Sequence, residues 1–291
     1  MKSQSQSTLA WRKICHEKWV DSWQERLLWL GGERLVITQF SGSKRVRLEI
    51  YDVTKSEATV LKREFGGEIR NLSRSTADWA KSIVQKKPIP IRGRLRIVNL
   101  EPKDGRTSNG DVIFVPASLA FGTGEHATTA GCLRLLCDIV RPGDTGWSFL
   151  DVGTGTGILA LAAAKLGAGH IDAIDADAVA VRTAKHNARL NGLSRKLRIW
   201  RQDVLKFKPE SVYDVVAANL YSVLLGQALP QLVKAARKGG SLIFSGILRD
   251  QEAEVTQWLR GTGLELKENR SRGKWTTLLA RKTDGAARTL D

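Results

Sequence analysis

The sequence predicts an α/β protein with a small N-terminal α/β domain and a larger C-terminal domain built on a seven-stranded, Rossmann-like sheet. Three observations predict it. From residue 149 onward, strand-like apolar runs alternate with amphipathic helical segments, which is typical of a mostly parallel sheet covered on both faces. A glycine-rich loop follows the first of these strands. The length of 291 residues favours two domains over one.

The N-terminal domain is expected over residues 1–77 and carries no motif for chemistry. After a polar start, residues 14–29 have helical periodicity. Residues 34–40 and 45–51 have the character of strands joined by a Ser-Gly-Ser turn. Thr54-x-x-Glu57 has the spacing of a capping box, which predicts a helix that stops at the following Gly-Gly pair.

Residues 78–111 are expected to form a linker, with a short helix at 79–84 and a polar hinge over 101–110. Between these, the run 91–97 alternates arginine with apolar residues. A strand with this period of two would be a charged edge strand or a contact for an anionic partner. On one face it would carry Arg92, Arg94 and Arg96.

The C-terminal domain is expected over residues 112–291 and contains the alternating pattern. Strands are predicted at 149–151, 171–175, 197–200, 212–219, 242–245, 264–268 and 275–280. Helices are predicted at 158–166, 177–190, 223–236 and 250–259. The last two strands follow each other without a helix between them, which favours a terminal antiparallel hairpin. In such a sheet, ligands bind at the carboxyl ends of the strands.

The glycine loop Asp151-Val-Gly-Thr-Gly-Thr-Gly157 lies between a predicted strand and a predicted helix, where the backbone can approach a ligand closely. Its spacing is GxGxG, and Ile158 stands where a dinucleotide fingerprint would have its third glycine. This favours S-adenosylmethionine over a pyrophosphate-containing cofactor. Asp175 ends the next strand, where its carboxylate can accept hydrogen bonds from ribose hydroxyls. Asp203, after the third strand, is placed to reach an adenine amino group.

Composition limits the class of protein. No apolar run is long enough for a membrane helix, and the polar start lacks the apolar core of a secretory signal, so a cytoplasmic protein is expected. The three cysteines and four histidines have no metal-binding spacing, and the cysteines are expected to be reduced. The formal net charge of +16 indicates an acidic partner, such as nucleic acid or a nucleoprotein particle, or serves solubility alone.

A second polar segment precedes a predicted amphipathic helix and reads Ala120-Phe-Gly-Thr-Gly-Glu-His-Ala-Thr-Thr129. Its glycines and threonines suit an anion- or carboxylate-binding turn, and Thr128 or Thr129 is expected to cap the helix. This segment resembles the AFGTGxHxTT signature of the bacterial ribosomal protein L11 methyltransferase (PrmA) family. The resemblance covers residues 115–282 and includes the glycine loop, Asp175 and the segment Ser-Gly-Ile-Leu at 245–248.

The resemblance implies an S-adenosylmethionine-dependent protein methyltransferase that modifies lysine or α-amino groups of a ribosomal protein. It also implies that the N-terminal domain docks this substrate. Ribosome association and direct nucleic-acid contact stay open, and no membrane partner is expected. The candidate cofactor-binding residues are Phe121, Thr129, Asp151, Gly153, Gly155, Asp175, Asp203 and Asn219. The candidate catalytic residues are Asn219, His126 and Tyr221, with a structural or substrate-lining role preferred for His126 and a packing role equally open for Tyr221.

One departure from the family pattern affects the expected substrate. The family usually has Asn-Ile-Leu-Ala-x-Pro-Leu after the fourth strand, whereas this chain has Asn-Leu-Tyr-Ser-Val-Leu-Leu at 219–225. Because this segment would face the methyl group and the incoming nucleophile, two alternatives stay open. They are a methyltransferase for a lysine of another protein, such as the electron-transfer flavoprotein, and an RNA methyltransferase.

Overall fold

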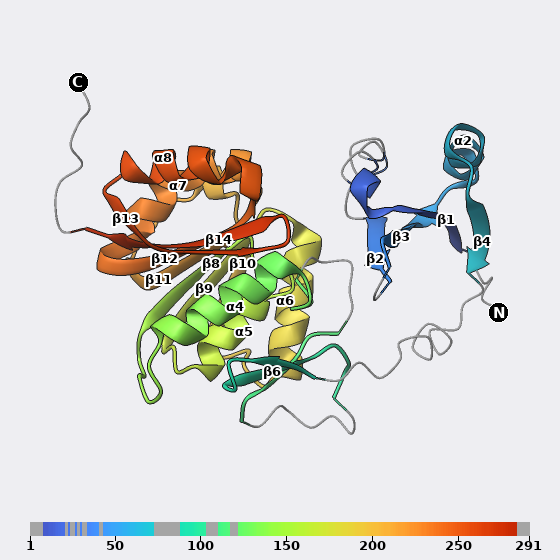
Figure 1. Ribbon diagram of the computed structural model, residues 1–291. Coiled ribbons are helices and arrows are strands. Elements are labelled where there is room, and N and C mark those ends of the chain that lie inside the picture. Colours follow the sequence, from blue (N-terminus) through green and yellow to red (C-terminus); the bar gives the residue numbers. More distant parts are fainter. Residues whose placement is uncertain are drawn as a thin grey trace. The chain divides into compact units, whose positions relative to one another are not determined.

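The computed structural model describes residues 8–20, 23, 27, 30, 34–40, 43–72, 88–102, 110–116 and 122–283. The chain divides into two compact units, Met1–Gln85 and Lys86–Asp291 (Figure 1). None of the helices in these described segments is long and apolar enough to cross a membrane. The helix expected at 79–84 lies outside the described residues.

In its described part, the first unit contains a four-stranded sheet in the order β2-β3-β1-β4, one α-helix and a short 3-10 helix, Glu17–Trp19. Its core includes the fully buried Trp11, Leu48, Ile50 and Leu61. The small α/β domain expected at this end of the chain is therefore present. Its elements are β1 (Thr8–His16), β2 (Leu35–Gln39), β3 (Arg45–Val53), α2 (Lys55–Phe65) and β4 (Glu68–Leu72).

The prediction of a helix from residue 14 is wrong at its start. Residues Thr8–His16 form β1, which pairs antiparallel with β3 on one side and with β4 on the other. The periodicity of a short segment does not reveal that two strands from elsewhere in the chain will lie beside it. Here those strands supply hydrogen-bond partners for its backbone. The strand β4 was not predicted either.

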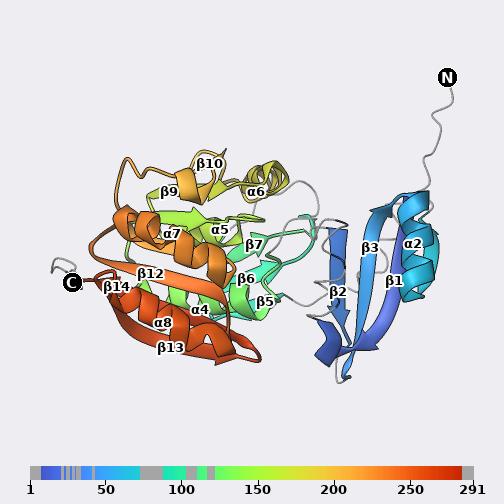
Figure 2. The same cartoon turned by 90° about the horizontal axis from the view of Figure 1, so that it is seen from above.

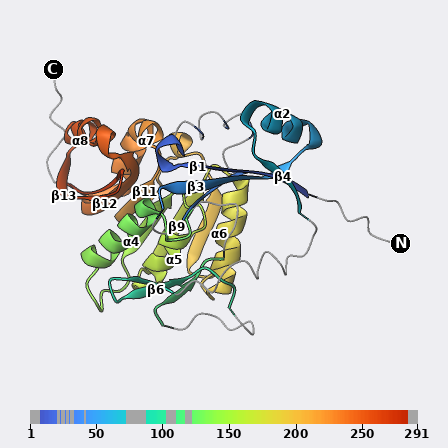
Figure 3. The same cartoon turned by 45° about the vertical axis from the view of Figure 1, so that its right-hand side comes forward.

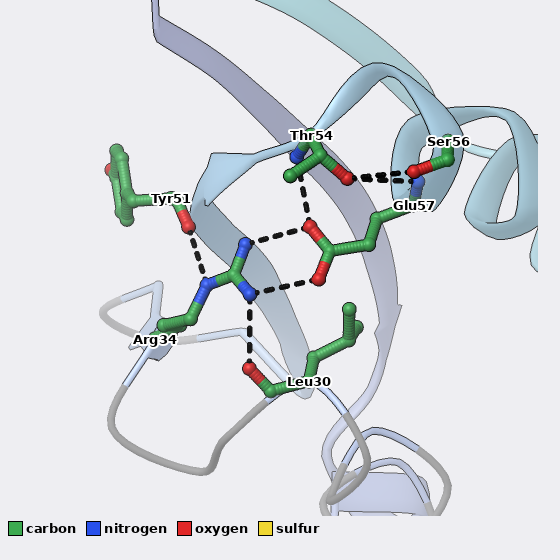
Figure 4. A network of polar contacts seen from close by, with 6 residues as sticks. All are labelled: Leu30, Arg34, Tyr51, Thr54, Ser56 and Glu57. Carbon is green, nitrogen blue, oxygen red and sulfur yellow. Dashed lines mark hydrogen bonds and ion pairs between the residues drawn. The ribbon is translucent and has the colours of Figure 1, made fainter.

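The capping box of α2 is present and is part of a larger polar network (Figure 4). The Glu57 N–H donates to Thr54 Oγ1 at 3.2 Å, and the Thr54 N–H donates to Glu57 Oε2 at 2.8 Å. Arg34 donates to both carboxylate oxygens of Glu57 at 3.0 Å and to the carbonyls of Leu30 and Tyr51 at 3.1 Å. These contacts lower the pKa of Glu57 to about 2, and the hydrogen bonds from Arg34 contribute the most. The helix ends at Gly66, as predicted.

The second unit begins with a three-stranded sheet formed by β5 (Ile89–Ile91), β6 (Leu95–Val98) and β7 (Val112–Phe114). Ile91, Ile97 and Ile113 are fully buried in the same hydrophobic cluster as Leu133, which lies in the helix Ala127–Ile139 of this unit. The described part of the expected linker therefore belongs to the second unit, because its apolar side chains complete that unit's core. Residues 103–109 of the expected hinge lie outside the described residues.

The run 91–97 is not a single strand with three arginines on one face. It turns at residues 92–94, with positive φ at Arg92 (52°) and Gly93 (64°). Arg94 donates to the carbonyls of Cys137 and Val140 at the end of helix α4 (Ala127–Ile139). A C-terminal helix turn leaves such carbonyls without intrahelical partners, so the arginine acts as a cap.

The large sheet has seven strands in the order β10-β9-β8-β11-β12-β14-β13. All strand pairs are parallel except those that β14 makes with β12 and β13, which are antiparallel. The predicted alternation and terminal hairpin are confirmed. The strands are β8 (Ser148–Val152), β9 (His170–Asp175), β10 (Leu197–Arg201), β11 (Tyr213–Asn219), β12 (Ala236–Leu248), β13 (Leu264–Arg272) and β14 (Trp275–Lys282).

Helices cover both faces of this sheet, as Figure 3 shows. One hydrophobic cluster joins the sheet to α4 and to α5 (Ile158–Lys165) and α6 (Ala178–Leu190). A second cluster joins the other face to α7 (Ser222–Ala235) and α8 (Glu252–Arg260). The carboxyl ends of β8, β9, β10 and β11 meet at one edge, where the glycine loop also lies.

Candidate active site

The glycine loop adopts a conformation that needs glycine. Gly153 and Gly157 have φ values of 70° and 82°, in the left-handed region. A Cβ atom at Gly153 would lie 2.5 Å from Leu220 Cδ2, and one at Gly157 would lie 3.1 Å from Ala184 Cβ. The loop is therefore packed between the end of β11 and helix α6, with its backbone at the carboxyl edge of the sheet.

Asp175 holds this loop at the end of β9. Its Oδ2 accepts the N–H of Gly155 and its Oδ1 accepts the N–H of Asp177, both at 2.9 Å. The side chain is only half-buried, and a carboxylate oxygen can accept more than one hydrogen bond. Asp175 thus lies beside the glycine loop, as the sequence predicted, and can bind a further donor there.

Asp151 is 1 % exposed and lies under the loop. Its Oδ2 accepts from Thr154 Oγ1 at 2.7 Å and from the Ala160 N–H at 3.2 Å, while its Oδ1 has no partner among the described residues. Burial raises the pKa of Asp151 to about 7, although both hydrogen bonds oppose this shift. Thr129 Oγ1 is likewise buried without a partner in the described parts of the chain. Two polar atoms here lack the partners that buried groups normally have.

A chain of hydrogen bonds joins the end of β11 to the start of α4. The Asn219 Nδ2 donates to Thr128 Oγ1 at 3.3 Å, and Thr128 Oγ1 lies 2.7 Å from His126 Nδ1. His126 Nδ1 also accepts the Thr128 N–H at 3.4 Å, so His126 and not a threonine caps α4. Burial, with the nearby Lys274, lowers the pKa of His126 and favours the neutral imidazole. The ring packs edge-on against Trp275, at 5.2 Å between centroids.

These hydrogen bonds orient the side-chain amide of Asn219. Because Nδ2 is directed at Thr128, the Oδ1 atom of the same planar amide is directed away from Thr128. The backbone that follows is fixed, since the Leu220 N–H donates to the Ser245 carbonyl at 3.0 Å. A Cβ atom at Gly246 would lie 2.2 Å from the Leu220 carbonyl oxygen, so this approach requires glycine.

The remaining predicted site residues differ in their surroundings. Tyr221 is 76 % exposed at the start of α7, and Val223 beside it is 69 % exposed. Asp203 follows β10 and accepts the Leu205 N–H at 2.9 Å as the cap of a short 3-10 helix, Val204–Lys206. Its neighbour Gln202 donates its N–H to the Asp175 carbonyl, which holds the ends of β9 and β10 together. Phe121 lies outside the described residues.

Two asparagines, one in α6 and one just after its end, support the site without having been predicted to do so. Asn187 Nδ2 donates to the Thr156 carbonyl at 2.8 Å, inside the glycine loop. Asn191 exchanges hydrogen bonds with the backbone of Phe114 in β7, through the Phe114 N–H and carbonyl. Both residues are about 1–2 % exposed. The sequence signal that could have identified them is two polar residues spaced four positions apart, which is the spacing of one helical face.

A family model described as ribosomal protein L11 methyltransferase (PrmA) matches residues 33–283, which is most of the chain. The chain belongs to this family. Family membership makes it a protein methyltransferase. Its seven-stranded sheet is the methyltransferase fold that the sequence predicted.

Individual relatives agree with the family model. A ribosomal protein L11 methyltransferase from Pelotomaculum thermopropionicum is 40 % identical over 77 % of this chain and 73 % of its own length. One from Chloroflexus aurantiacus is 30 % identical over 87 % of this chain and 88 % of its own length. The crystal structure of a ribosomal protein L11 methylase from Lactobacillus delbrueckii subsp. bulgaricus matches with a TM-score of 0.57 and 30 % identity, over 68 % of this chain and 99 % of that one.

Proposed function

We propose that this chain transfers methyl groups from S-adenosylmethionine to lysine or α-amino groups of ribosomal protein L11. The observation that carries the proposal is the family match over residues 33–283. The placement of the glycine loop beside Asp175 and the Asn219–Thr128–His126 chain at one sheet edge is in keeping with it. A ribosomal protein substrate also favours a cytoplasmic enzyme.

The described residues fit S-adenosylmethionine. Asp175 would accept hydrogen bonds from the ribose hydroxyls, and Asp203 would reach the adenine amino group from the next strand. The backbone of Gly153 and Gly155 would line the cofactor. Asp151 Oδ1 and Thr129 Oγ1, the two buried atoms without partners, would gain them when the amino acid end of the cofactor binds, directly or through water.

The protein's main contribution to methyl transfer would be orientation. Bound S-adenosylmethionine supplies an electrophilic methyl group on a sulfonium. Asn219 Oδ1 would accept an N–H of the substrate amine and align its lone pair, which can be worth several orders of magnitude in rate. The amine must be neutral, and removing it from water lowers its pKa so that its proton leaves to solvent.

His126 is better suited to positioning than to proton transfer. Its Nδ1 is already an acceptor for Thr128, so the neutral ring carries its proton on Nε2 and has no free acceptor for a substrate proton. His126 would therefore act through Thr128 on the Asn219 amide. Tyr221, exposed at the start of α7, would line the approach to the amine, together with Val223.

The first unit would dock the protein substrate. It has its own core and, in its described part, no cluster of three or more metal-ligating side chains. Selecting one protein amine requires contact area beyond the reacting group, and a separate compact domain can supply it.

A direct methylation assay tests the proposal. The full chain is incubated with S-adenosylmethionine labelled in its methyl group and with one purified acceptor at a time. The acceptors are ribosomal protein L11, the electron-transfer flavoprotein and ribosomal RNA. We expect label in L11, at lysine or the α-amino group. Label only in the flavoprotein or the RNA would refute the proposed substrate, and label in none would refute the activity.

A further inference from the structure

A row of cationic side chains covers the outer side of α4, away from the glycine loop. It combines residues from the β5–β6 turn, α4, the segment after α4 and β13, which contacts α4. Figure 2 shows α4 with the β5–β6 hairpin on one side and β13 on the other. We call this row the basic track, and it consists of Arg92, Arg134, Arg141, Lys267, Arg270 and Arg272.

Direct contacts hold the middle of the basic track together. Arg92 and Arg270 both donate to Asp138 Oδ2, at 2.8 and 2.6 Å, so two guanidinium groups converge on one carboxylate oxygen. Arg134 lies among the other arginines: burial and the positive charges of Arg272, Arg92 and Arg270 lower its pKa. Like charges gathered in this way are unfavourable unless a counter-charge is nearby.

Carboxylates along the basic track are fewer than its cations. Four lie against it: Asp138, Glu268 beside Arg270, Glu265 beside Lys267 at 2.5 Å, and Asp144, which accepts the Arg141 backbone N–H at 3.2 Å. The six cations of the track therefore leave an excess of positive charge. Arg141 and Arg272 are exposed, and their side chains make no ion pair within the described residues.

The basic track leads to a cavity of about 560 Å³ at the amino edge of the large sheet. Arg141 and Lys267 line it, as do Arg237 and Arg281 from the strands β12 and β14. Two carboxylates, Asp144 and Asp214, also line it, and Asp214 is paired with Arg237. The cavity lies at the opposite edge of the sheet from the candidate active site and is separate from it.

The length and chemistry of the track indicate the kind of partner. From Lys267 to Arg272, β13 alone extends roughly 17 Å at ~3.3 Å per residue, which is too long for one small anion to contact throughout. Arginine presents a planar fork that binds phosphate oxygens in pairs, and five of the six residues are arginines. A polymer with phosphates at regular intervals fits such a row. We propose that the basic track binds the phosphate backbone of a nucleic acid. This inference does not depend on the proposed methyl transfer.

Binding of a fluorescein-labelled oligouridylate to the full chain, followed by anisotropy over a salt series, tests the proposal. The test variant is R141E/R272E. The control is K185E/R189E, which makes the same change in net charge on exposed residues of α6. Thermal unfolding of each variant establishes that it is folded, and the milder pair R141Q/R272Q replaces the test variant if charge reversal prevents folding.

We expect the intact chain to bind, with an affinity that falls steeply as salt rises. R141E/R272E should weaken binding at least ~10-fold and reduce the salt slope by about 1.4, since each lost contact to a single strand contributes ~0.7. K185E/R189E should change affinity by less than ~2-fold. An equal loss of affinity in both variants would show that only net charge matters, and it would overturn the proposal. Failure of the intact chain to bind the oligouridylate would overturn it as well. Polyglutamate and unlabelled oligouridylate are also compared as competitors at equal charge. If polyglutamate competes as effectively, the basic track binds an acidic protein instead.

Discussion

Single side chains at the carboxyl edge of the sheet combine structural and proposed binding roles. Asp175 fixes the glycine loop through Gly155 and, at the same time, keeps lone pairs for a ligand. Asn219 is oriented by Thr128, which is in turn bonded to His126. Because each group is positioned by a neighbour, the effect of a substitution depends on which of its contacts is lost.

Replacing Asp175 with alanine should weaken S-adenosylmethionine binding by about 1.5–3 kcal/mol, the scale of lost hydrogen bonds to a charged group. Isothermal titration calorimetry measures the change. Asp177→Ala is the control, because Asp177 is exposed and caps α6 through Val179 without a proposed cofactor contact. An unchanged dissociation constant in folded Asp175→Ala protein would remove Asp175 from the cofactor site.

Asn219→Ala should lower turnover by ~100-fold while changing cofactor affinity much less, because its amide oxygen is proposed to align the amine in the transition state. Steady-state kinetics with the protein substrate, together with cofactor binding, separate these effects. Thr128→Val keeps the asparagine but removes its anchor, so an intermediate loss of turnover is expected. Equal losses of turnover and affinity in Asn219→Ala would make Asn219 a cofactor contact only.

At the scale of elements, polar side chains decide how helices begin and end. The capping box and Arg34 secure the start of α2, and Arg94 secures the end of α4. His126 caps the start of α4 and joins that helix to β11 through Thr128. These contacts link each helix to a strand or turn that is distant in the sequence.

Glu57 makes the first unit sensitive to acid. Its pKa is lowered from 4.5 to about 2, so its contribution is fully present above pH 4.5 and is lost as pH falls from 4.5 through 2. Glu57→Gln should lower the free energy of unfolding by about 1–2 kcal/mol near neutral pH and flatten its dependence on pH in this window. Urea unfolding at several pH values, followed by tryptophan fluorescence, measures both effects.

Glu64→Gln provides the matched control for this experiment. Glu64 lies on the same helix and pairs with Arg63, but both side chains are at least half exposed, at 50 % and 70 %. Its replacement should change stability by less than ~0.5 kcal/mol. If both variants lost the same stability, the Arg34 network would have no special role.

At the scale of the whole molecule, the boundary between the two units determines which fragments fold. The second unit begins at Lys86, and β5 and β6 complete its core. A fragment of residues 86–291 should therefore bind S-adenosylmethionine within a few-fold of the intact chain. Its methylation of the protein substrate should fall by orders of magnitude, because the docking domain that raises the local concentration of substrate is missing.

Calorimetry and the methylation assay measure the two outcomes. A fragment of residues 112–291 is the informative comparison. It lacks the buried Ile91, Leu95 and Ile97 and the Arg94 cap, so it should be markedly less stable. Methylation of the protein substrate by residues 86–291 at the rate of the intact chain would contradict the docking role.

The sequence by itself determined the features that depend on near neighbours. The capping box of Thr54 and Glu57, the glycine loop and the alternation of strands with helices all follow from residues a few positions apart. The position of Asp175 could also be predicted, because this residue ends a strand that must lie next to the loop. These patterns are local, and the fold did not override them.

Only the tertiary structure decided the features that depend on distant partners. β1 is a strand because β3 and β4 lie on either side of it. Residues 91–97 turn back where Arg94 meets the end of α4, and the apolar side chains of this run enter the core of the second unit. Asn187 and Thr128 gained roles through Thr156 and Asn219, which are far from them in the chain. Burial and hydrogen bonding are satisfied by whichever groups the fold brings together, and spacing along the chain does not reveal them.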